Sequence, residues 1–343
     1  MNFCHCTIIP KSVLEKLAKD STLSDSARGN FRTTLRIDGA IRKLRDQARD
    51  FATEIHGQMS MAATLAASAS ILVYDLHHSQ SLPGLPITNP GASADASVRQ
   101  AYATAKKVAD FYTQAFGRNS VDNAGMSLLS SVHYSTGYNN AFWNGAQMVY
   151  GDGDGNIFVD FTRGNDVIGH ELTHGVTQYT LQLRYQNQPG GLNESLSDVF
   201  GSMFRQWEAG QTAATADWLI GKEIMGPGAL SRGFTCLRDM ANPAAPHCLS
   251  PQPTHFSQYH SGMDPHESSG IPNLAFCTSA RIAGGKSWEN VGKAWYAAMT
   301  AGASPSMRMK TFANRTRKAA NAEFGAGSAV ANAVDQGWSQ VGL

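Results

Sequence analysis

A His-Glu-x-x-His stretch has the residue types and the spacing of a zinc site. Residues four apart lie on one face of a helix, so His170 and His174 can direct imidazole nitrogens at one ion, with Glu171 beside it. Glu194 follows after residues 175–193 and suits the third ligand position. A catalytic zinc site leaves its fourth position to water, whose pKa falls to about 7, and Glu171 is placed to take the proton. The pattern predicts a metal-assisted hydrolase.

The residues around the two segments indicate that both are helical. Chance alone would place the pentapeptide in roughly one sequence in a hundred of this length, so it needs support from its surroundings. Val167, Leu172 and Val176 give the first segment an apolar face, and residues 193–198 also have a helical pattern. Asp198, one turn after the third ligand, could accept the outer N–H of a ligand histidine.

Further motifs follow one another in order along residues 131–343. They are Ser131-Val132-His133-Tyr134-Ser135, Gly137 to Gly145, Gly151-Asp152-Gly153-Asp154-Gly155, Tyr185-Gln186-Asn187, Asn193 to Asp198, Leu237-Arg238, His266 to Ile271 and Val341-Gly342-Leu343. Together with the His-Glu-x-x-His helix, these motifs resemble the thermolysin-like metallopeptidases. The resemblance implies an α+β fold of two lobes: an N-terminal α/β lobe with an antiparallel sheet, a central zinc-binding helix, and a C-terminal lobe that is mainly α-helical.

The resemblance also implies a role for each residue of the catalytic centre. One zinc ion would be held by His170, His174 and Glu194. Glu171 would be the general base and later the proton donor, and Asp198 would orient His170. These implied roles agree with the chemistry expected from the residue types alone.

Tyr185 and His266 are the implied pair that stabilises the oxyanion. A tetrahedral intermediate carries negative charge on the former carbonyl oxygen, and a phenol or an imidazolium opposite the metal stabilises that charge by a few kcal/mol. Without the resemblance, a lone Tyr or His in a loop is more often structural, so both assignments depend on the motif match. Asp264 precedes His266 in a shortened segment; either it is the partner of this histidine, or the histidine is positioned differently.

For the substrate, the resemblance implies an extended peptide that binds as an added strand. Asn140 and the backbone of Ala141 would hold this strand, and Arg238 would hold the carbonyl on the leaving-group side. A hydrophobic pocket there would be lined by Phe158, Phe161, Val167, Ile220 and Leu237. The implied preference is for a bulky apolar residue directly after the cut bond.

The carboxylates of the family's double calcium site are largely replaced. Asp166 and Asp217 remain, but Arg205, Leu219 and Lys222 stand where carboxylates are expected. Calcium takes six to eight oxygen ligands and needs compensating negative charge. Calcium binding as such stays open, and we expect the double site to be lost.

The N-terminal residues resemble the short propeptide of the protealysin-like subgroup over residues 4–20, with Lys11 in place of the second proline of that motif. We expect this leader to cover the cleft and to be removed by proteolysis. The thiols and the imidazole of Cys4, His5 and Cys6 could reach the zinc and block it, or they could belong to a mobile terminus.

Three units are expected from these signals: a propeptide at residues 1–50, an N-terminal α+β catalytic lobe at 51–163, and the zinc-binding helix with the C-terminal helical lobe at 164–343. The periodicity predicts a strand at 71–74 and a helix at 94–116. Residues 128–161 form a pattern of strands and turns, and two late helices are expected at 287–301 and 305–324.

Composition excludes several classes of partner. A net charge of +1 gives no electrostatic case for nucleic acid. Residues 59–75 are largely apolar, but the stretch is too short and contains too many polar residues to span a membrane. No secretory signal peptide is evident, which favours a cytoplasmic location or secretion by a non-classical route.

Of the five cysteines, Cys236 and Cys248 are close enough for a loop-closing disulfide, while Cys277 suits a buried thiol.

The sequence therefore predicts a zinc-dependent neutral endopeptidase made as a zymogen. It would be a monomer that hydrolyses peptides or proteins on the N-terminal side of bulky hydrophobic residues, through a zinc-bound water activated by Glu171. A zinc aminopeptidase is disfavoured because the Gly-x-Met-Glu-Asn signature is absent, and a serine hydrolase because no Gly-x-Ser-x-Gly turn occurs. The alternative is a latent or inactive zinc protein whose retained prosegment makes it a binding module.

Overall fold

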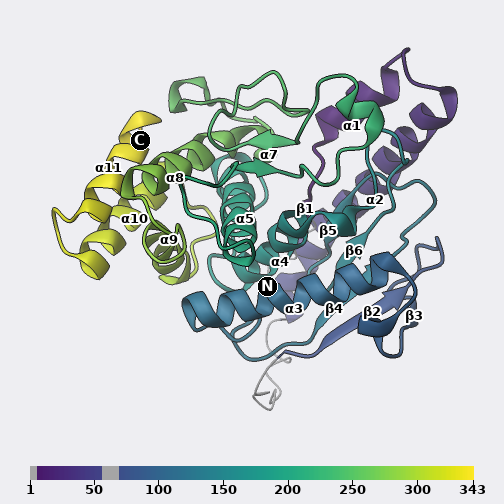
Figure 1. Ribbon diagram of the computed structural model, residues 1–343, viewed down its shortest axis with the longest axis horizontal. Helices are drawn as coiled ribbons and strands as arrows, with labels where there is room; N and C mark the ends of the chain where they lie inside the picture. Colours follow the sequence, from purple (N-terminus) through teal and green to yellow (C-terminus); the bar gives the residue numbers. More distant parts are fainter. Residues whose placement is uncertain (1–5, 56–68) are drawn as a thin grey trace.

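The computed structural model describes residues 6–55 and 69–343, and the side chains of 6–43 and 69–343. These residues form two lobes with a helix buried between them (Figure 1). In chain order the elements are β1 (Cys6–Thr7), α1 (Lys11–Lys19), α2 (Asp25–Ile55), β2 (Ile71–Asp75), β3 (Leu85–Pro86), η1 (Pro90–Ala92), α3 (Ala96–Phe116), β4 (Leu128–Val132), β5 (Ala141–Trp143), β6 (Met148–Tyr150), η2 (Phe161–Arg163), α4 (Asn165–Tyr179), α5 (Asn187–Glu208), β7 (Leu219–Ile220), α6 (Pro227–Leu230), β8 (Arg238–Asp239), η3 (Phe256–Gln258), α7 (Pro265–Ser268), α8 (Gly270–Ala283), α9 (Val291–Thr300), α10 (Met309–Phe324) and α11 (Ala329–Gln340). The predicted strand at 71–74 is confirmed as β2, which is one residue longer, and the helices predicted at 94–116, 287–301 and 305–324 are confirmed as α3, α9 and α10, each slightly shorter.

The N-terminal lobe is built on a six-stranded sheet in the order β1-β5-β6-β4-β2-β3. Strand β4 pairs in parallel with both β2 and β6, whereas the remaining pairs are antiparallel. The sheet is therefore mixed, and the expectation of an antiparallel sheet was wrong on this point. The β2–β4 pair is parallel because the connection between them includes α3, which packs on both strands and returns the chain in the same direction. The β4–β6 pair is parallel because the intervening strand β5 pairs antiparallel with the far side of β6.

Local signals fix the ends of α3. The side chain of Asp95 accepts hydrogen bonds from the backbone N–H groups of Ser97 and Val98, which satisfies donors that the first helical turn leaves open. Gly117 ends the helix in the left-handed conformation, at φ 65°. The helix thus begins and ends where the sequence places a cap.

Helix α4 runs between the lobes and is buried on all sides, from Asp166 to Gln178. It packs closely against α5 because both helices carry a glycine at the contact. A Cβ atom on Gly201 would lie 2.6 Å from the carbonyl oxygen of Asp166, and one on Gly169 would lie 3.1 Å from the Cα of Gly201. This close approach sets the distance between the two helices that carry the predicted zinc ligands.

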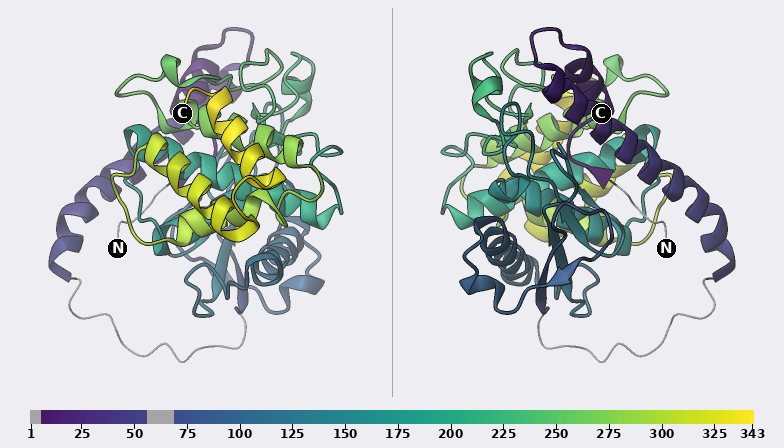
Figure 2. Two further views of the ribbon diagram at one scale, coloured as in Figure 1. Left: turned by 90° about the vertical axis from the view of Figure 1, so that its left-hand side faces the viewer. Right: turned by 90° about the vertical axis from the view of Figure 1, so that its right-hand side faces the viewer.

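The C-terminal lobe is a group of helices in which α8 packs on α11 and α10 on α9 (Figure 2, left). Its centre is aromatic: Trp295 and Trp338 stack with ring centroids 5.5 Å apart, and Phe312 meets Trp338 edge-on. No helix among the described residues is both long enough and apolar enough to cross a membrane.

The leader begins with β1, which is part of the sheet, and continues into α1 and α2 on the outside of the molecule. Helices α1 and α2 pack together, and α2 runs along one side of the protein (Figure 2, right). Phe31 of α2 is fully buried and meets Phe158 edge-on. The predicted boundary at residue 50 falls within α2 and stays a prediction.

Candidate active site

Three predicted zinc ligands converge between α4 and α5. The Nε2 atoms of His170 and His174 are 3.1 Å apart. The carboxylate of Glu194 lies 3.4 Å from the first of these nitrogens and 3.5 Å from the second. All three side chains are fully buried. Their spacing follows from the helical repeat, which places residues 170 and 174 on one face of α4.

This arrangement fits a zinc ion. Ligand atoms bound to zinc at 2.0–2.2 Å in a tetrahedron lie about 3.3–3.6 Å from one another, close to the separations found here. Glu194 Oε2 is buried and has no hydrogen-bond partner among the described residues. Burial lowers the pKa of His174 to about 3, so its imidazole is neutral, as a metal ligand must be. Burial alone would lower the pKa of His170, but Asp198 and Glu194 outweigh it and raise the pKa to about 9, so this imidazole would give up a proton when a divalent cation binds.

The outer nitrogens of both histidines are held by partners on α5. His170 Nδ1 lies 2.9 Å from Asp198 Oδ1, as the sequence predicts. His174 Nδ1 lies 2.8 Å from Asn193 Oδ1 and 3.0 Å from the hydroxyl of Ser197, neither of which the sequence reading singled out. Both contacts leave Nε2 as the metal-facing atom.

Asp198 is itself held by a buried network. Arg238 donates from Nε to Asp198 Oδ2 at 2.8 Å and from Nη2 to Oδ1 at 2.7 Å, and Asn273 donates to Oδ2 at 2.8 Å. This paired geometry fixes the carboxylate that orients His170. Asn273 was also missed at the sequence level, because its partner is distant along the chain.

Glu171 lies in a fully buried position beside the histidines. Its Oε2 accepts a hydrogen bond of 2.9 Å from the backbone N–H of Trp143, and its Oε1 has no partner among the described residues. Burial raises the pKa of this carboxyl well above its usual value. One oxygen is therefore anchored, and the other is available to hold a proton.

Tyr185 and His266 lie together beside the ligand carboxylate. The Tyr185 hydroxyl donates to Glu194 Oε1 and lies 3.3 Å from His266 Nε2. Asp264 Oδ1 lies 2.8 Å from His266 Nδ1, so it is the partner of this histidine in the shortened segment. Burial alone would lower the pKa of His266, but Glu194 and Asp264 outweigh this effect and raise it, which favours the charged imidazolium.

The leader occupies the groove predicted for substrate. Strand β1 pairs antiparallel with the edge strand β5, and the N–H of Ile8 donates to the carbonyl of Ala141 at 3.2 Å. The side chain of Asn140 binds Ile9 twice, accepting from its N–H at 2.9 Å and donating to its carbonyl at 3.3 Å. The leader is thus bound as an added strand.

Two charged side chains contact the leader carbonyls next to this strand. Arg238 Nη1 donates to the carbonyl oxygen of Ile8 at 3.2 Å, and His266 Nε2 lies 2.6 Å from that of Thr7. The Thr7–Ile8 peptide bond therefore lies between the two side chains predicted to contact substrate carbonyls on either side of the cut bond.

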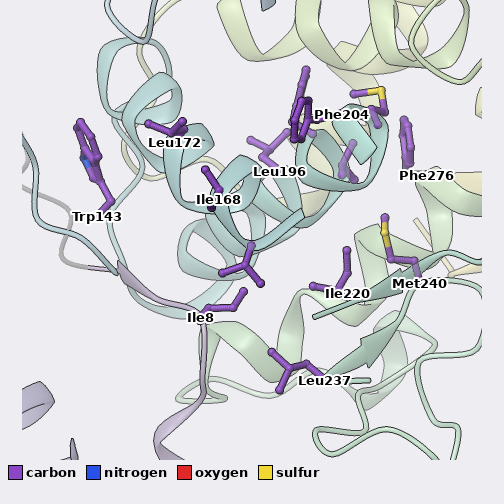
Figure 3. Packing of buried hydrophobic residues seen from close by; sticks show 14 of the residues in the cluster. Ile8, Trp143, Ile168, Leu172, Leu196, Phe204, Ile220, Leu237, Met240 and Phe276 are labelled. Atoms are coloured by element: carbon purple, nitrogen blue, oxygen red, sulfur yellow. The ribbon is translucent and has the colours of Figure 1, made fainter. Parts of the chain in front are cut away.

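Ile8 itself is fully buried in the hydrophobic core of the cleft. The predicted pocket residues Phe158, Phe161, Val167, Ile220 and Leu237 are also fully buried and belong to the same hydrophobic cluster as Ile8. Figure 3 shows Ile8 in the part of the core that contains Ile220 and Leu237. The branched apolar side chain of Ile8 is thus buried in the same core as the residues predicted to line the pocket.

Cys6 lies at the metal centre. Its sulfur, a nitrogen of His174 and a carboxylate oxygen of Glu194 all lie within 4.8 Å of one another. The sulfur is part of a disulfide. Of the three leader residues that could reach the zinc, Cys6 does approach it, while Cys4 and His5 lie outside the described residues.

A guanidinium stands among the remaining carboxylates of the predicted calcium region. Arg205 forms an ion pair with Asp217, and its Nη1 lies 3.6 Å from Asp166 and 3.5 Å from Glu223. Lys222 adds a second cation at 3.4 Å from Asp217. The side chains of Arg205 and Lys222 therefore supply positive charge among these carboxylates.

The fold and the site together define a metallopeptidase of the thermolysin type, and the comparisons agree. The family described as thermolysin metallopeptidase, catalytic domain, matches residues 42–178, and its alpha-helical domain matches residues 181–343. The chain belongs to the thermolysin metallopeptidase family, whose members are zinc endopeptidases acting on peptide substrates.

Similar proteins include an "Extracellular metalloprotease" of Pectobacterium carotovorum subsp. carotovorum, which is 41% identical over 81% of this chain and 82% of its own length. A "Thermolysin" of Bacillus sp. (strain EA1) is 36% identical over 80% of this chain and 51% of its own length. Among solved structures, the precursor of protealysin from Serratia proteamaculans superposes with a TM-score of 0.83 at 38% identity, covering 98% of this chain and 99% of that one.

Proposed function

We propose that this zinc endopeptidase is made as a latent precursor and cuts peptide bonds on the N-terminal side of bulky hydrophobic residues. The observation that carries the proposal is the leader strand paired with β5, with Ile8 buried in the core that contains the predicted pocket residues. A segment bound this way excludes substrate until it is removed. The similarity to the precursor of protealysin supports the same conclusion.

The catalytic roles follow from the positions of the side chains. When bound by His170, His174 and Glu194, zinc supplies a Lewis acid and lowers the pKa of a water to about 7. Glu171 takes the proton of the attacking water on its free oxygen and passes it to the leaving amine. Asp198 keeps the ring of His170 in the orientation that a ligand needs.

The developing oxyanion is stabilised by His266 and Tyr185. His266 already contacts a backbone carbonyl, that of Thr7, and Asp264 keeps its imidazolium charged and oriented. Tyr185 is close enough to add a second donor. Donors fixed before the reaction act without reorganisation in a water-excluded site.

Specificity is assigned to the pocket after the cut bond. Asn140, Ala141 and Arg238 hold the substrate backbone, while Phe158, Phe161, Val167, Ile220 and Leu237 accept the side chain. Fully burying a Leu, Ile or Phe side chain contributes about 1.5–3 kcal/mol, whereas a carboxylate there would be desolvated without a partner. Substrates with an apolar residue at this position are therefore preferred.

The remaining carboxylates of the calcium region are proposed to be neutralised by Arg205, so that the double calcium site of the family is lost. Asp166 and Asp217 would otherwise repel each other and attract a cation. A guanidinium fixed in their midst supplies the compensating charge without a metal.

Cleavage of internally quenched peptides tests the proposal. Peptides with Leu or Phe after the scissile bond are compared with one carrying Asp, using wild type, Glu171→Ala and the surface control Glu289→Ala, while mass spectrometry follows the N-terminus. We expect wild type and the control to lose about fifty residues and to cut only the apolar peptides. Glu171→Ala should stay intact and inert.

One alternative is a latent zinc protein whose prosegment is retained. It is favoured by the depth of the leader contacts, since Asp38 of α2 is fully buried and accepts hydrogen bonds from Tyr138 and Asn140. An intact, zinc-loaded wild type without activity would support this alternative and overturn the zymogen proposal. Cutting of the Asp peptide would overturn the specificity instead.

A further inference from the structure

A second cluster of metal-binding side chains lies outside the catalytic centre. Cys236, His247 and Cys248 each offer a ligand atom, and these three atoms lie within 4.8 Å of one another. Both cysteines are buried, and His247 is partly exposed. The cluster joins Cys236, which precedes β8, to His247 and Cys248 in the loop that follows it, and none of its members takes part in the peptidase chemistry described above.

The distance between the two sulfurs suits shared coordination of one ion. Cys236 Sγ and Cys248 Sγ are 3.8 Å apart, and both cysteines are free. A disulfide requires about 2.0 Å, so the loop-closing disulfide considered from the sequence is not formed. Two thiolates bound to zinc at about 2.3 Å in a tetrahedron lie about 3.8 Å apart.

The backbone holds the ligands in this arrangement. Cys236 and Cys248 face each other in an isolated parallel β-bridge. The N–H of Leu249 donates to the carbonyl of Cys236 at 2.9 Å, and that of Thr235 donates to the carbonyl of His247 at 3.0 Å. The two segments are therefore tied together on both sides of the cysteines, and bringing the ligands together needs no refolding of the loop.

Charge around the cluster is favourable to a cation. Asp239 Oδ2 lies 3.3 Å from His247 Nε2, while its Oδ1 is occupied by the backbone N–H groups of Ala241 and Asn242. The Asp239 carboxylate therefore stands beside the cluster, where its negative charge favours a cation bound by the two cysteines as thiolates, the form that binds metal.

We propose that Cys236, Cys248 and His247 bind a second ion, a soft divalent cation of the zinc class, with Asp239 as the neighbouring carboxylate. Thiolate and imidazole ligands select such cations over calcium or magnesium. The ion would cross-link residues 236 and 248, and would hold the start of β8 in place. The role of this ion would be structural. Arg238 lies two residues after Cys236 and donates two hydrogen bonds to Asp198, so an ion that fixes Cys236 would also help to fix Arg238.

Zinc content measured by mass spectrometry tests the proposal. The full chain is prepared as Glu171→Ala, which keeps it intact, in the presence of a thiol-free reductant and after removal of loosely bound metal. We expect two zinc ions per chain, and one in the double variant Cys236→Ser/Cys248→Ser. The matched control Cys277→Ser, which removes a buried thiol from α8, should retain both ions.

Cobalt substitution separates this site from the catalytic one. Because Cys6 also lies near a metal position, the measurement uses a chain with Cys4→Ser and Cys6→Ser. We expect a thiolate-to-cobalt charge-transfer band that persists in His174→Ala and disappears in His247→Ala when a competing chelator is present. The catalytic site has only nitrogen and oxygen ligands and gives no such band.

Two results would overturn the proposal. One is a single zinc ion per reduced chain together with the absence of the thiolate band. The other is a Cys236–Cys248 disulfide, detected as an intact mass lower by two hydrogens, provided that the chain still takes up no second ion once this disulfide has been reduced. If the Cys236→Ser/Cys248→Ser variant fails to fold, the cobalt band of the chain that keeps Cys236 and Cys248 and carries only Cys4→Ser and Cys6→Ser decides the question.

Discussion

At the scale of single residues, the catalytic centre depends on side chains that never touch the substrate. Asn193 and Ser197 hold the outer nitrogen of His174, as Asp198 does for His170. Their spacing of four on α5 is the signal by which a sequence reading could have found them, since it places both on the face that carries Glu194.

Replacing Asn193 by alanine should weaken zinc binding. Without the amide oxygen, the imidazole of His174 loses its fixed tautomer and orientation, and loss of such a partner typically costs about 10–100-fold in metal affinity. Competition with a fluorescent chelator measures this. Ser195→Ala, on the same helix, is the matched control and should keep wild-type affinity; equal affinity in both variants would contradict the assignment.

Calcium should not stabilise the wild-type chain, because Arg205 supplies the charge among the carboxylates. We expect the midpoint of thermal unfolding to be the same with calcium and with a calcium chelator. Arg205→Ala should unfold at a lower temperature and recover part of the loss when calcium is added. The exposed neighbour Arg163→Ala should show neither effect, and a calcium response in wild type would refute the proposal.

At the scale of elements, the active site requires two helices to lie unusually close. Helices α4 and α5 meet at Gly169 and Gly201, and this close contact determines the distance between Glu194 and the two histidines. Strand β5 is the second decisive element, because its open edge accepts either a substrate or the leader strand β1.

A methyl group on Gly201 should separate these helices. Its Cβ would meet the carbonyl oxygen of Asp166 at 2.6 Å, and overpacking of this kind typically costs about 1–3 kcal/mol. Urea unfolding of Gly201→Ala in the Glu171→Ala chain measures the change. Gly29→Ala, in α2 with open space around it, should be neutral or stabilising by up to about 1 kcal/mol.

A charge on the leader strand should release the cleft. Ile8→Asp would bury a carboxylate without a partner in the apolar pocket, so β1 should detach from β5. We expect the lag before peptide cleavage to shorten severalfold. Ser12→Asp, at an exposed position of α1, is the control with the same added charge. An unchanged lag for Ile8→Asp would show that this strand does not limit activation.

At the scale of the whole molecule, docking of the leader should depend on pH through Asp38. Burial raises the pKa of this carboxyl from 3.8 to about 6, although Tyr138, Arg42 and Asn140 act in the opposite direction. Because the docked-state pKa is the higher one, the stabilisation is complete below pH 4 and is lost as the pH rises through 6.

The expected result is that the leader docks more firmly at pH 5 than at pH 7. Thermal unfolding of the intact Glu171→Ala chain across this range measures it, and Asp38→Asn should flatten the dependence because an amide does not titrate. Asp20→Asn serves as the comparison, since the pKa of Asp20 is lowered to about 2 by Thr22 and Arg232 and lies outside the range. A slope that survives Asp38→Asn would refute this account.

The sequence by itself determined the family, and it predicted the zinc ligands and the general base. His170, Glu171 and His174 are set by the helical repeat, a local property that needs no knowledge of the rest of the fold. Helices α3, α9 and α10 and strand β2 were predictable for the same reason, because hydrophobic periodicity acts over a few residues.

Only the tertiary structure decided what meets across long stretches of chain. The parallel pairs of the sheet and the contact of Asp38 with Asn140 join segments whose spacing carries no periodic signal. Such contacts form because the whole core closes around them, so their partners are selected by packing and burial rather than by local sequence.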